Sequence, residues 1–429
     1  MGGNMSATIK IENLCAVRFC KMNVDDFMVL TGEQAEGKST IAKCIFLCRT
    51  IKDDVFTLLM KDMYFQDQKR ILKAIKSTLR NKFLRMFGTS LAMSANMVLQ
   101  YWYSEESFIM FSIKKNDAET DLIEKFVEVT FSDKLLNDLK EVIQNRNKID
   151  DLKATISNLF YDEYQTIFIP AGRNLITLLT SQLNYLYATM DDRQKRMMDY
   201  TTQQYIEYIL KIRPSFGDGL EGLLTDLNNG NRKKALKMVD LIQTILKGRY
   251  VYRDGAELLY LAGDDSYRNK YVRINFTSSG QQETVWIFNI LFYLFVNHTK
   301  AFIIVEEPEA HLYPDAQKKI TELLAYMYNQ NCQMMLTTHS PYVLGALNNL
   351  IYADYIADKK KMETQVNECI GKEFWIHQCA AYQVARGEIY TCIEDEEEHL
   401  ISNSVIDGAS EDINELFDKL FDIAQSNEE

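Results

Sequence analysis

The sequence lacks several features that mark particular classes of protein. Its eight cysteines include no C-x-x-C pair, so neither a zinc ribbon nor a disulfide scaffold is indicated, and a reducing cytoplasm fits best. Its longest apolar run, residues 287–296, is too short to span a bilayer of about 30 Å. No charged segment followed by an apolar one opens the chain, so we expect a protein without a secretory leader. There is no heptad array long enough for an extended coiled coil, and no internal repeat.

What is present is the composition of an ordinary globular protein. The 429 residues are 47% hydrophobic and 25% charged, which predicts a substantial buried core. This length allows two or three domains, or one large α/β domain with insertions. Length alone does not choose between them.

The negative charge is concentrated at one end of the chain. Residues 393–429 hold thirteen acids and one base, whereas the whole chain has 60 acids and 48 bases, so residues 1–392 carry 47 of each. Bulk charge therefore gives no reason to expect non-specific nucleic-acid binding. We expect this acidic tail to form an amphipathic helix that docks on a neighbouring surface, because it has an apolar stripe: Ile413, Leu416, Phe417, Leu420, Phe421 and Ile423.

Strand and helix patterns alternate along the body. The apolar patterns predict strands at residues 8–11, 27–30, 97–103, 108–114, 166–173, 249–252, 256–261, 271–276, 301–305 and 332–338. Helical patterns fill the intervening segments, including a helical lobe over about 174–247. The sequence thus predicts an α/β fold over residues 1–392, with a mixed sheet, an antiparallel β subdomain and an inserted helical lobe, followed by the tail at 393–429.

A glycine-bounded loop follows the strand at 27–30 and opens a helix. Residues 32–39 match G-x-x-x-x-G-K-[S/T] completely, which happens by chance in about 1–2% of chains this long. Backbone N–H groups of such a loop face a phosphate, the lysine reaches the β- and γ-oxygens, and the hydroxyl serves Mg²⁺. The candidate nucleotide-binding residues here are Gly32, Glu33, Gln34, Ala35, Glu36, Gly37, Lys38, Ser39 and Thr40.

Two later strands end in polar side chains. Glu306 and Glu307 follow the buried strand at 301–305, and His339 follows the next strand. In an open α/β sheet these carboxyl ends lie beside the phosphate loop. One acid can hold Mg²⁺ while the other polarises a water molecule. Considered alone, the acids also fit a solvated charge pair, and a single histidine is more often structural.

A second anion-binding pattern precedes those acids. Ser278, Gly280 and Gln281 lie between a strand and a helix, where small residues expose backbone N–H groups at a helix N-terminus. One domain needs one phosphate loop. A second anion-binding segment that cannot reach the phosphate loop within its own chain predicts a nucleotide held between two protomers.

These segments, in this order, resemble a known family. GEQAEGKST, SSGQQE, IIVEEPEAHLYP and TTHSP are similar to the motifs of the ABC-type ATPase head, in the branch of OLD, RecF and SMC-like proteins and of stand-alone phage-defence ATPases. The sequences EEPEAHLYP and SSGQQE are closer to those of the OLD-like group than to those of transporter subunits. The segment TIFIPAGR is similar to an IPA-x-R segment recurrent in that group.

The resemblance implies a role for each matched residue. It makes Lys38 and Ser39 Walker A residues, Glu306 the Mg²⁺-side Walker B residue and Glu307 the catalytic base. By the same resemblance His339 is the switch histidine facing the γ-phosphate, and Ser278 and Gly280, with Gln281 beside them, form a signature that acts in trans. Two departures stand out: Glu306 replaces the more usual Asp, and no glutamine marks the Q-loop, for which Arg173 is our candidate.

The resemblance implies a cytoplasmic, Mg²⁺-dependent ATPase that works as a homodimer or higher homo-oligomer around ATP. It further implies control of a separate effector protein, such as a nuclease, in antiphage defence or DNA repair, and no membrane partner. A scaffold that binds ATP and sequesters a partner with negligible turnover is the alternative, and a transporter subunit is a third. The basic helix face over residues 69–85 fits either a solvated surface or a contact with DNA or a partner.

Overall fold

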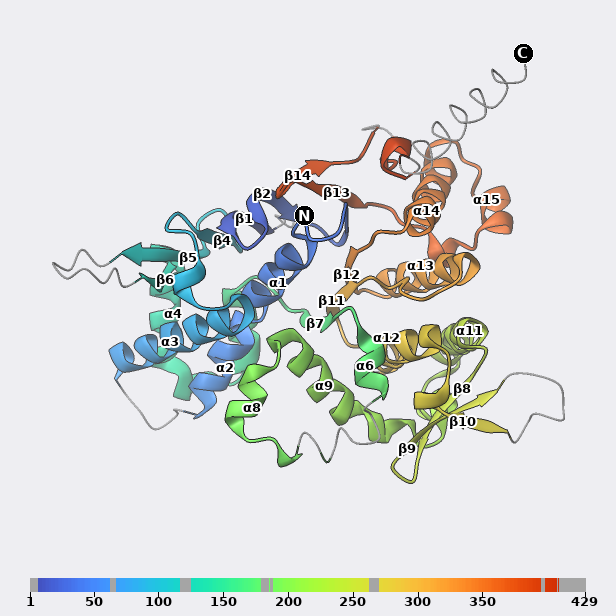
Figure 1. Cartoon of the computed structure of the whole chain (residues 1–429), viewed down its shortest axis with the longest axis horizontal. Helices are drawn as coiled ribbons and strands as arrows, with labels where there is room; N and C mark the ends of the chain where they lie inside the picture. Colours follow the sequence, from blue (N-terminus) through green and yellow to red (C-terminus); the bar gives the residue numbers. More distant parts are fainter. Residues whose placement is uncertain are drawn as a thin grey trace, which may run out of the picture.

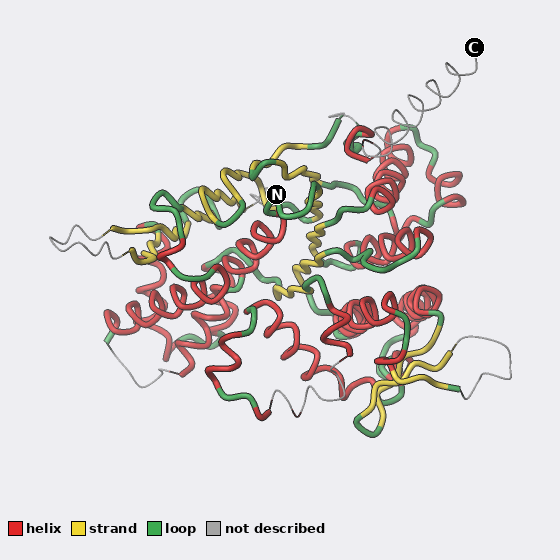
Figure 2. Tube along the Cα trace, in the orientation of Figure 1, coloured by secondary structure: helices red, strands yellow, loops and turns green. Residues whose placement is uncertain are grey.

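The computed structural model describes residues 7–61, 67–115, 125–178, 185, 188–261, 270–394, 398–406 and 408. The predicted amphipathic helix of the tail lies outside these residues. The described chain is built around one large mixed sheet, with helices on both faces and a smaller antiparallel sheet beside it (Figure 1). Figure 2 shows the strands of the main sheet as a band that ends at the centre of the molecule.

The main sheet has eleven strands. In spatial order they are β6 (Lys125–Phe131), β5 (Phe108–Lys115), β4 (Val98–Trp102), β1 (Ala7–Leu14), β2 (Val17–Val24), β14 (Glu388–Thr391), β13 (Ala380–Ala385), β3 (Phe27–Thr31), β12 (Gln333–Thr337), β11 (Ala301–Glu306) and β7 (Gln165–Ile169). Strands β13, β3, β12, β11 and β7 are parallel, whereas the run from β6 to β2 is antiparallel. The smaller sheet has the order β10 (Tyr271–Arg273), β9 (Ala256–Leu261), β8 (Gly248–Arg253).

Helices cover both faces because the central parallel strands are apolar on both sides. In β3, Phe27 and Val29 pack into one core while Met28 and Leu30 pack into the other. The first core is closed by α9 (Tyr200–Ile212), α11 (Asn229–Leu246), α12 (Ser279–Val296), α13 (Pro314–Tyr328) and α14 (Pro341–Lys359). The second is closed by α1 (Lys38–Arg49), α2 (Ile51–Lys61), α3 (Gln68–Phe87), α4 (Asp133–Asn145) and α5 (Leu152–Leu159). The described residues also form four short helices: α6 (Arg173–Leu178), α8 (Asp192–Met197), α10 (Gly219–Gly222) and α15 (Glu363–Cys369).

Most of the predicted elements are present, with two clear corrections. The strand predicted over residues 166–173 is too long, because β7 ends at Ile169 and α6 begins at Arg173. The strand predicted over residues 271–276 is wrong in its second half, because only β10 is extended and Ile274–Phe276 form a 3₁₀ turn. Both the N–H and the hydroxyl of Thr277 donate to the Ile274 carbonyl, which fixes that turn ahead of α12. Strands β2, β6, β13 and β14 were not predicted.

The packed body extends beyond Cys392, the predicted end of the ATPase domain. Ile401 is 1% exposed and packs in the core closed by α14. Its N–H and C=O exchange hydrogen bonds of 2.8 Å with the Asn348 side chain, and Ser402 N–H donates to the Cys392 carbonyl. The division of the chain into a body and a tail stays a prediction, and any truncation that tests it belongs after Gly408.

The long apolar run at 287–296 lies within α12, in the core. Across the ranges given above, no helix combines the length and the apolar character needed to cross a bilayer. All eight cysteines fall in these ranges and none forms a disulfide.

Candidate active site

The glycine-bounded loop joins β3 to α1 and is packed so tightly that its two glycines are required. A Cβ on Gly32 would lie 2.2 Å from the Val384 carbonyl oxygen, and one on Gly37 would lie 2.8 Å from a methyl group of Val17. Both glycines also have positive φ, 129° and 117°, which side chains disfavour. Glu36 accepts a hydrogen bond of 3.1 Å from Gly387 N–H, which ties the loop to the β13–β14 hairpin.

Lys38 lies inside this loop rather than in solvent. Its Nζ donates to the carbonyls of Gly32 at 2.8 Å and Glu33 at 2.6 Å, and lies 3.5 Å from His339 Nδ1. Burial lowers the pKa of Lys38, while the nearby carboxylates of Glu307 and Glu36 act in the opposite direction. The ammonium group is therefore held at the centre of the loop, where a phosphate would neutralise it.

Glu306 ends β11 and is 5% exposed. Its Oε2 accepts a hydrogen bond of 3.2 Å from Ala171 N–H, while Oε1 is buried and accepts no hydrogen bond of ordinary geometry. Burial raises the pKa of Glu306, and the nearby Ser39 hydroxyl partly offsets this. A buried carboxylate oxygen beside a hydroxyl is a suitable pair of ligands for a hard cation such as Mg²⁺.

Glu307 follows β11 with φ of 44°, and its side chain is 41% exposed. Its N–H donates to the Thr337 carbonyl at 2.8 Å, which holds the turn against β12. Glu307 Oε1 lies 3.5 Å from His339 Nε2, so the two ring nitrogens of His339 face Glu307 and Lys38. Two segments predicted separately from the sequence thus meet at the loop.

Glu309 is a residue that the sequence analysis missed. It is 9% exposed, and its Oε1 accepts hydrogen bonds from the Thr338 hydroxyl at 2.5 Å and from His339 N–H at 3.0 Å. Glu309 therefore fixes the backbone that carries His339. In the sequence, Glu309 is the third acid of EEPEAH. The local sequence does not distinguish it from an exposed acid, because its burial depends on the tertiary structure.

Glu309→Leu is expected to lower ATP turnover about ten- to hundredfold, because small misplacements of catalytic groups have effects of that size. ATP binding should change less, since the hydrogen bonds of Glu309 go to the histidine segment and its charge acts on Lys38 less than those of Glu307 and Glu36 do. Glu309→Gln retains an acceptor oxygen and serves as the matched control. Steady-state phosphate release together with nucleotide titration checks this, and equal loss in both variants would contradict a positioning role.

Arg173, the Q-loop candidate, is fully buried, so it is not placed to reach a nucleotide. Its guanidinium donates to the carbonyls of Pro170, Glu306 and Glu307 at 2.6, 2.6 and 2.9 Å. It also pairs with Glu283 of α12, with Nε 3.2 Å from Oε2. Arg173 therefore joins the carboxyl ends of β7 and β11 to α12.

The second anion-binding pattern is intact but separate. Ser278 caps α12, and Gln281 completes a capping box with it while donating to the Leu246 carbonyl at 2.7 Å. A Cβ on Gly280 would lie 2.7 Å from the His311 carbonyl oxygen. Among the described contacts, none joins Ser278, Gly280 or Gln281 to the phosphate loop. The structure thus brings together Lys38, Ser39, Glu306, Glu307 and His339, and leaves this group apart.

Comparison with known families identifies the class of protein. Residues 5–344 match the family model AAA_15, described as an AAA ATPase domain. This match covers most of the chain and contains every predicted site residue, so the chain belongs to this ATPase-domain family. It confirms the ATPase resemblance drawn from the motifs. Comparison with curated proteins gives no match.

Solved structures similar to this chain include heads of SMC proteins. An Smc head bound to the C-winged helix domain of ScpA has 10% identity and a TM-score of 0.41, covering 90% of this chain and 95% of that one. The SMC head of Thermotoga maritima has 10% identity and a TM-score of 0.36, with coverages of 90% and 98%. An Smc head with an extended coiled coil, bound to a ScpA C-terminal domain derived from Pyrococcus furiosus, has 11% identity, a TM-score of 0.37 and coverages of 90% and 94%.

Proposed function

We propose that this chain binds ATP with Mg²⁺ and hydrolyses it. The observation that carries the proposal is the convergence of three segments: Lys38 from the loop, Glu307 from the end of β11 and His339 from the end of β12 lie in one chain of contacts. The buried Glu306 oxygen lies at the same sheet edge. The family match supports an ATPase and the residues supply its parts.

Each residue has one task in this proposal. The backbone N–H groups of the loop and Lys38 bind the phosphates, and the lysine exchanges its two carbonyl partners for phosphate oxygens. Ser39 and Glu306 would hold Mg²⁺, which would supply positive charge beside the transferred phosphoryl group. Glu307 takes a proton from the attacking water, and His339 positions that carboxylate and faces the terminal phosphate.

The direct test is Mg²⁺-dependent phosphate release by the purified chain. We expect turnover that is abolished by EDTA and by Lys38→Ala, with nucleotide binding lost in that variant. The alternative function, a scaffold gated by nucleotide with negligible turnover, predicts tight binding and no release above the Lys38→Ala background. Failure of the wild-type chain to bind ATP would contradict both.

We further propose that two protomers sandwich ATP, with Ser278, Gly280 and Gln281 of one facing the loop of the other. The separation of the two anion-binding groups within one chain supports this arrangement. The expected assembly is a homodimer or a higher homo-oligomer that closes on ATP. It would transmit closure to a separate effector, with antiphage defence or DNA repair in the cytoplasm as the context.

Mixing two inactive variants tests the sandwich. Ser279 is an exposed first residue of α12, so Ser279→Glu repels phosphate without a clash and favours the helix N-terminus. Mixed with Lys38→Ala chains, it should restore up to about a quarter of wild-type turnover, because a mixed dimer keeps one intact site out of two. If native mass spectrometry shows that mixed assemblies form but turnover is not restored, the trans arrangement is contradicted.

DNA binding through the basic face stays a proposal. A groove of 460 Å³ between α3 and α4 is lined, among the residues that the structure describes, by no acid and by five basic residues: Lys69, Lys73, Lys76, Arg80 and Lys140. Such a groove suits a polyanion. A loss of oligonucleotide affinity in Lys73→Glu, with a steep salt dependence in the wild type, would support it.

A further inference from the structure

The main sheet ends at β7, and the outer edge of this strand has free backbone groups. Gln165 N–H donates to the Lys300 carbonyl, so the backbone groups of Gln165 point toward β11. In a parallel ladder, every second residue directs its N–H and C=O groups to the same neighbouring strand. Ile167 and Ile169 therefore bond to β11, while the N–H and C=O groups of Thr166 and Phe168 point away from it. Within the described ranges, no other backbone or side-chain group pairs with them.

A groove of 820 Å³ runs along this edge. Residues 165–168 form its floor, and α2, α5 and α9 contribute to its walls. Two hydroxyls that line it, those of Thr166 and Tyr205, are buried and have no hydrogen-bond partner among the described residues. Buried polar groups in proteins are normally paired, so these two hydroxyls lack the partners that such groups usually have.

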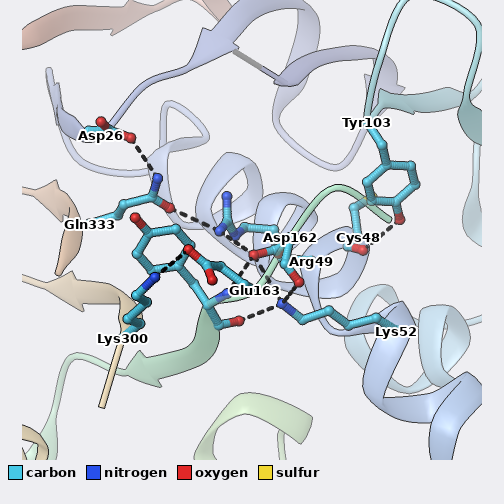
Figure 3. A network of polar contacts seen from close by, with 10 residues as sticks. Asp26, Cys48, Arg49, Lys52, Tyr103, Asp162, Glu163, Lys300 and Gln333 are labelled. Carbon is cyan, nitrogen blue, oxygen red and sulfur yellow. Dashed lines mark hydrogen bonds and ion pairs between the residues drawn. The ribbon is translucent and has the colours of Figure 1, made fainter. Parts of the chain in front are cut away.

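The amino-terminal end of the edge is held by a buried ion cluster (Figure 3). Lys52 donates to the Tyr164 carbonyl at 2.5 Å and contacts Asp162 Oδ1 at 3.0 Å, and Arg49 donates to the same oxygen at 2.9 Å. These three charged side chains are 5–8% exposed. Gln333 links Arg49 to β12. The edge is therefore preorganised, which lowers the entropic cost of binding.

The charges of the groove favour an acidic occupant. Three of its lysines are neutralised by acids: Lys52 by Asp162, Lys82 by Asp54, and Lys300 by Glu163. This leaves Lys153 and Lys211, both exposed and without an ion pair within the described ranges, against Asp53. The rim thus keeps a net positive charge.

We infer that the β7 edge is a docking site for an extended, acidic segment of a partner protein, which adds to the sheet as a twelfth strand. Only a polypeptide backbone supplies alternating C=O and N–H groups at the spacing of Thr166 and Phe168, about 6.6 Å for two residues of a strand. The inference goes beyond ATP hydrolysis. It also places a partner next to the site, because β7 leads directly to Ala171, which bonds Glu306, and to Arg173.

The probe is a fluorescein-labelled heptapeptide, Glu-Val-Thr-Val-Glu-Val-Glu, at low ionic strength. We expect saturable binding to the full chain, and about a tenfold or greater loss when alternate backbone amides are N-methylated, because two or more backbone hydrogen bonds are removed. Lys153→Glu combined with Lys211→Glu should weaken binding about tenfold. Lys359→Glu combined with Lys361→Glu, two exposed lysines at and just beyond the C-terminal end of α14, is the charge-matched control and should have no effect.

Residue-level amide hydrogen exchange supplies a second measurement that does not depend on activity. Saturating peptide should slow exchange at Thr166 and Phe168 and change little at Ile167, which is already bonded to β11. No binding up to about 1 mM, equal binding of the N-methylated peptide, or unchanged exchange at both residues would overturn the inference. Lys38→Ala should bind the peptide normally, so a failed ATPase proposal and a failed docking site give different results.

Discussion

Glu307→Gln is expected to bind ATP as the wild-type chain does and to lose about 100-fold or more in turnover, since a general base contributes roughly that factor. The substitution keeps the size of the side chain, which is 41% exposed, and leaves its backbone hydrogen bond to Thr337 intact. The ability to accept a proton is removed, together with the negative charge beside Lys38 and His339. Nucleotide titration and single-turnover phosphate release measure the two effects separately.

The matched control is Glu106→Gln, another exposed glutamate, which pairs with Lys134. It should leave binding and turnover unchanged. A trapped ATP dimer of the Glu307→Gln variant, seen as doubled mass on size exclusion, is the further expected sign of closure without hydrolysis. Turnover equal to that of the wild type would remove Glu307 from the mechanism.

Arg173→Met is expected to destabilise the fold by about 3–5 kcal/mol, the usual cost of leaving one partner of a buried ion pair alone. Glu283 is only 1% exposed and would lose its cation, and the carbonyls of Glu306 and Glu307 would lose their donors. Chemical denaturation followed by circular dichroism measures this loss. Arg173 and Glu283 together therefore hold the carboxyl ends of β7 and β11 against α12.

Two companion variants separate stability from positioning. Arg173→Lys keeps the charge but not the planar fork, so it should retain part of the stability while turnover falls more than ATP affinity. Arg249→Lys alters an exposed arginine that lies 3.9 Å from Glu221 and should change neither quantity. If the free energy of unfolding of Arg173→Met equals that of the wild type, the buried Arg173–Glu283 pair does not stabilise the fold.

The chemistry of the site was readable from the sequence because it depends on local patterns. A strand, a glycine loop and a helix are contiguous, so residues 27–49 predicted β3, the phosphate loop and α1. Likewise, Glu306, Glu307 and His339 follow apolar strands, and parallel strands end at one edge. The roles of these residues stay predictions, but their convergence on Lys38 is a feature of the structure.

Other predictions failed or stayed open because they depend on contacts between distant residues. Arg173 matched a motif position, yet burial turned it from a nucleotide contact into a link between β7, β11 and α12. Glu309 resembled a surface acid until Thr338 and His339 closed over it. Neither burial nor hydrogen bonding across 29 or more residues leaves a local signal in the sequence.

The sequence by itself determined the α/β class, the phosphate loop and the two acids at the end of β11, since each follows from spacing along a few residues. Only the tertiary structure decided the strand order, which sets β13 against β3 and leaves β7 at the edge. It also decided that Gly32 must be glycine, because the carbonyl of Val384, more than 350 residues away, occupies the space of a side chain. Such contacts arise from packing between segments, and local periodicity carries no information about which segments meet.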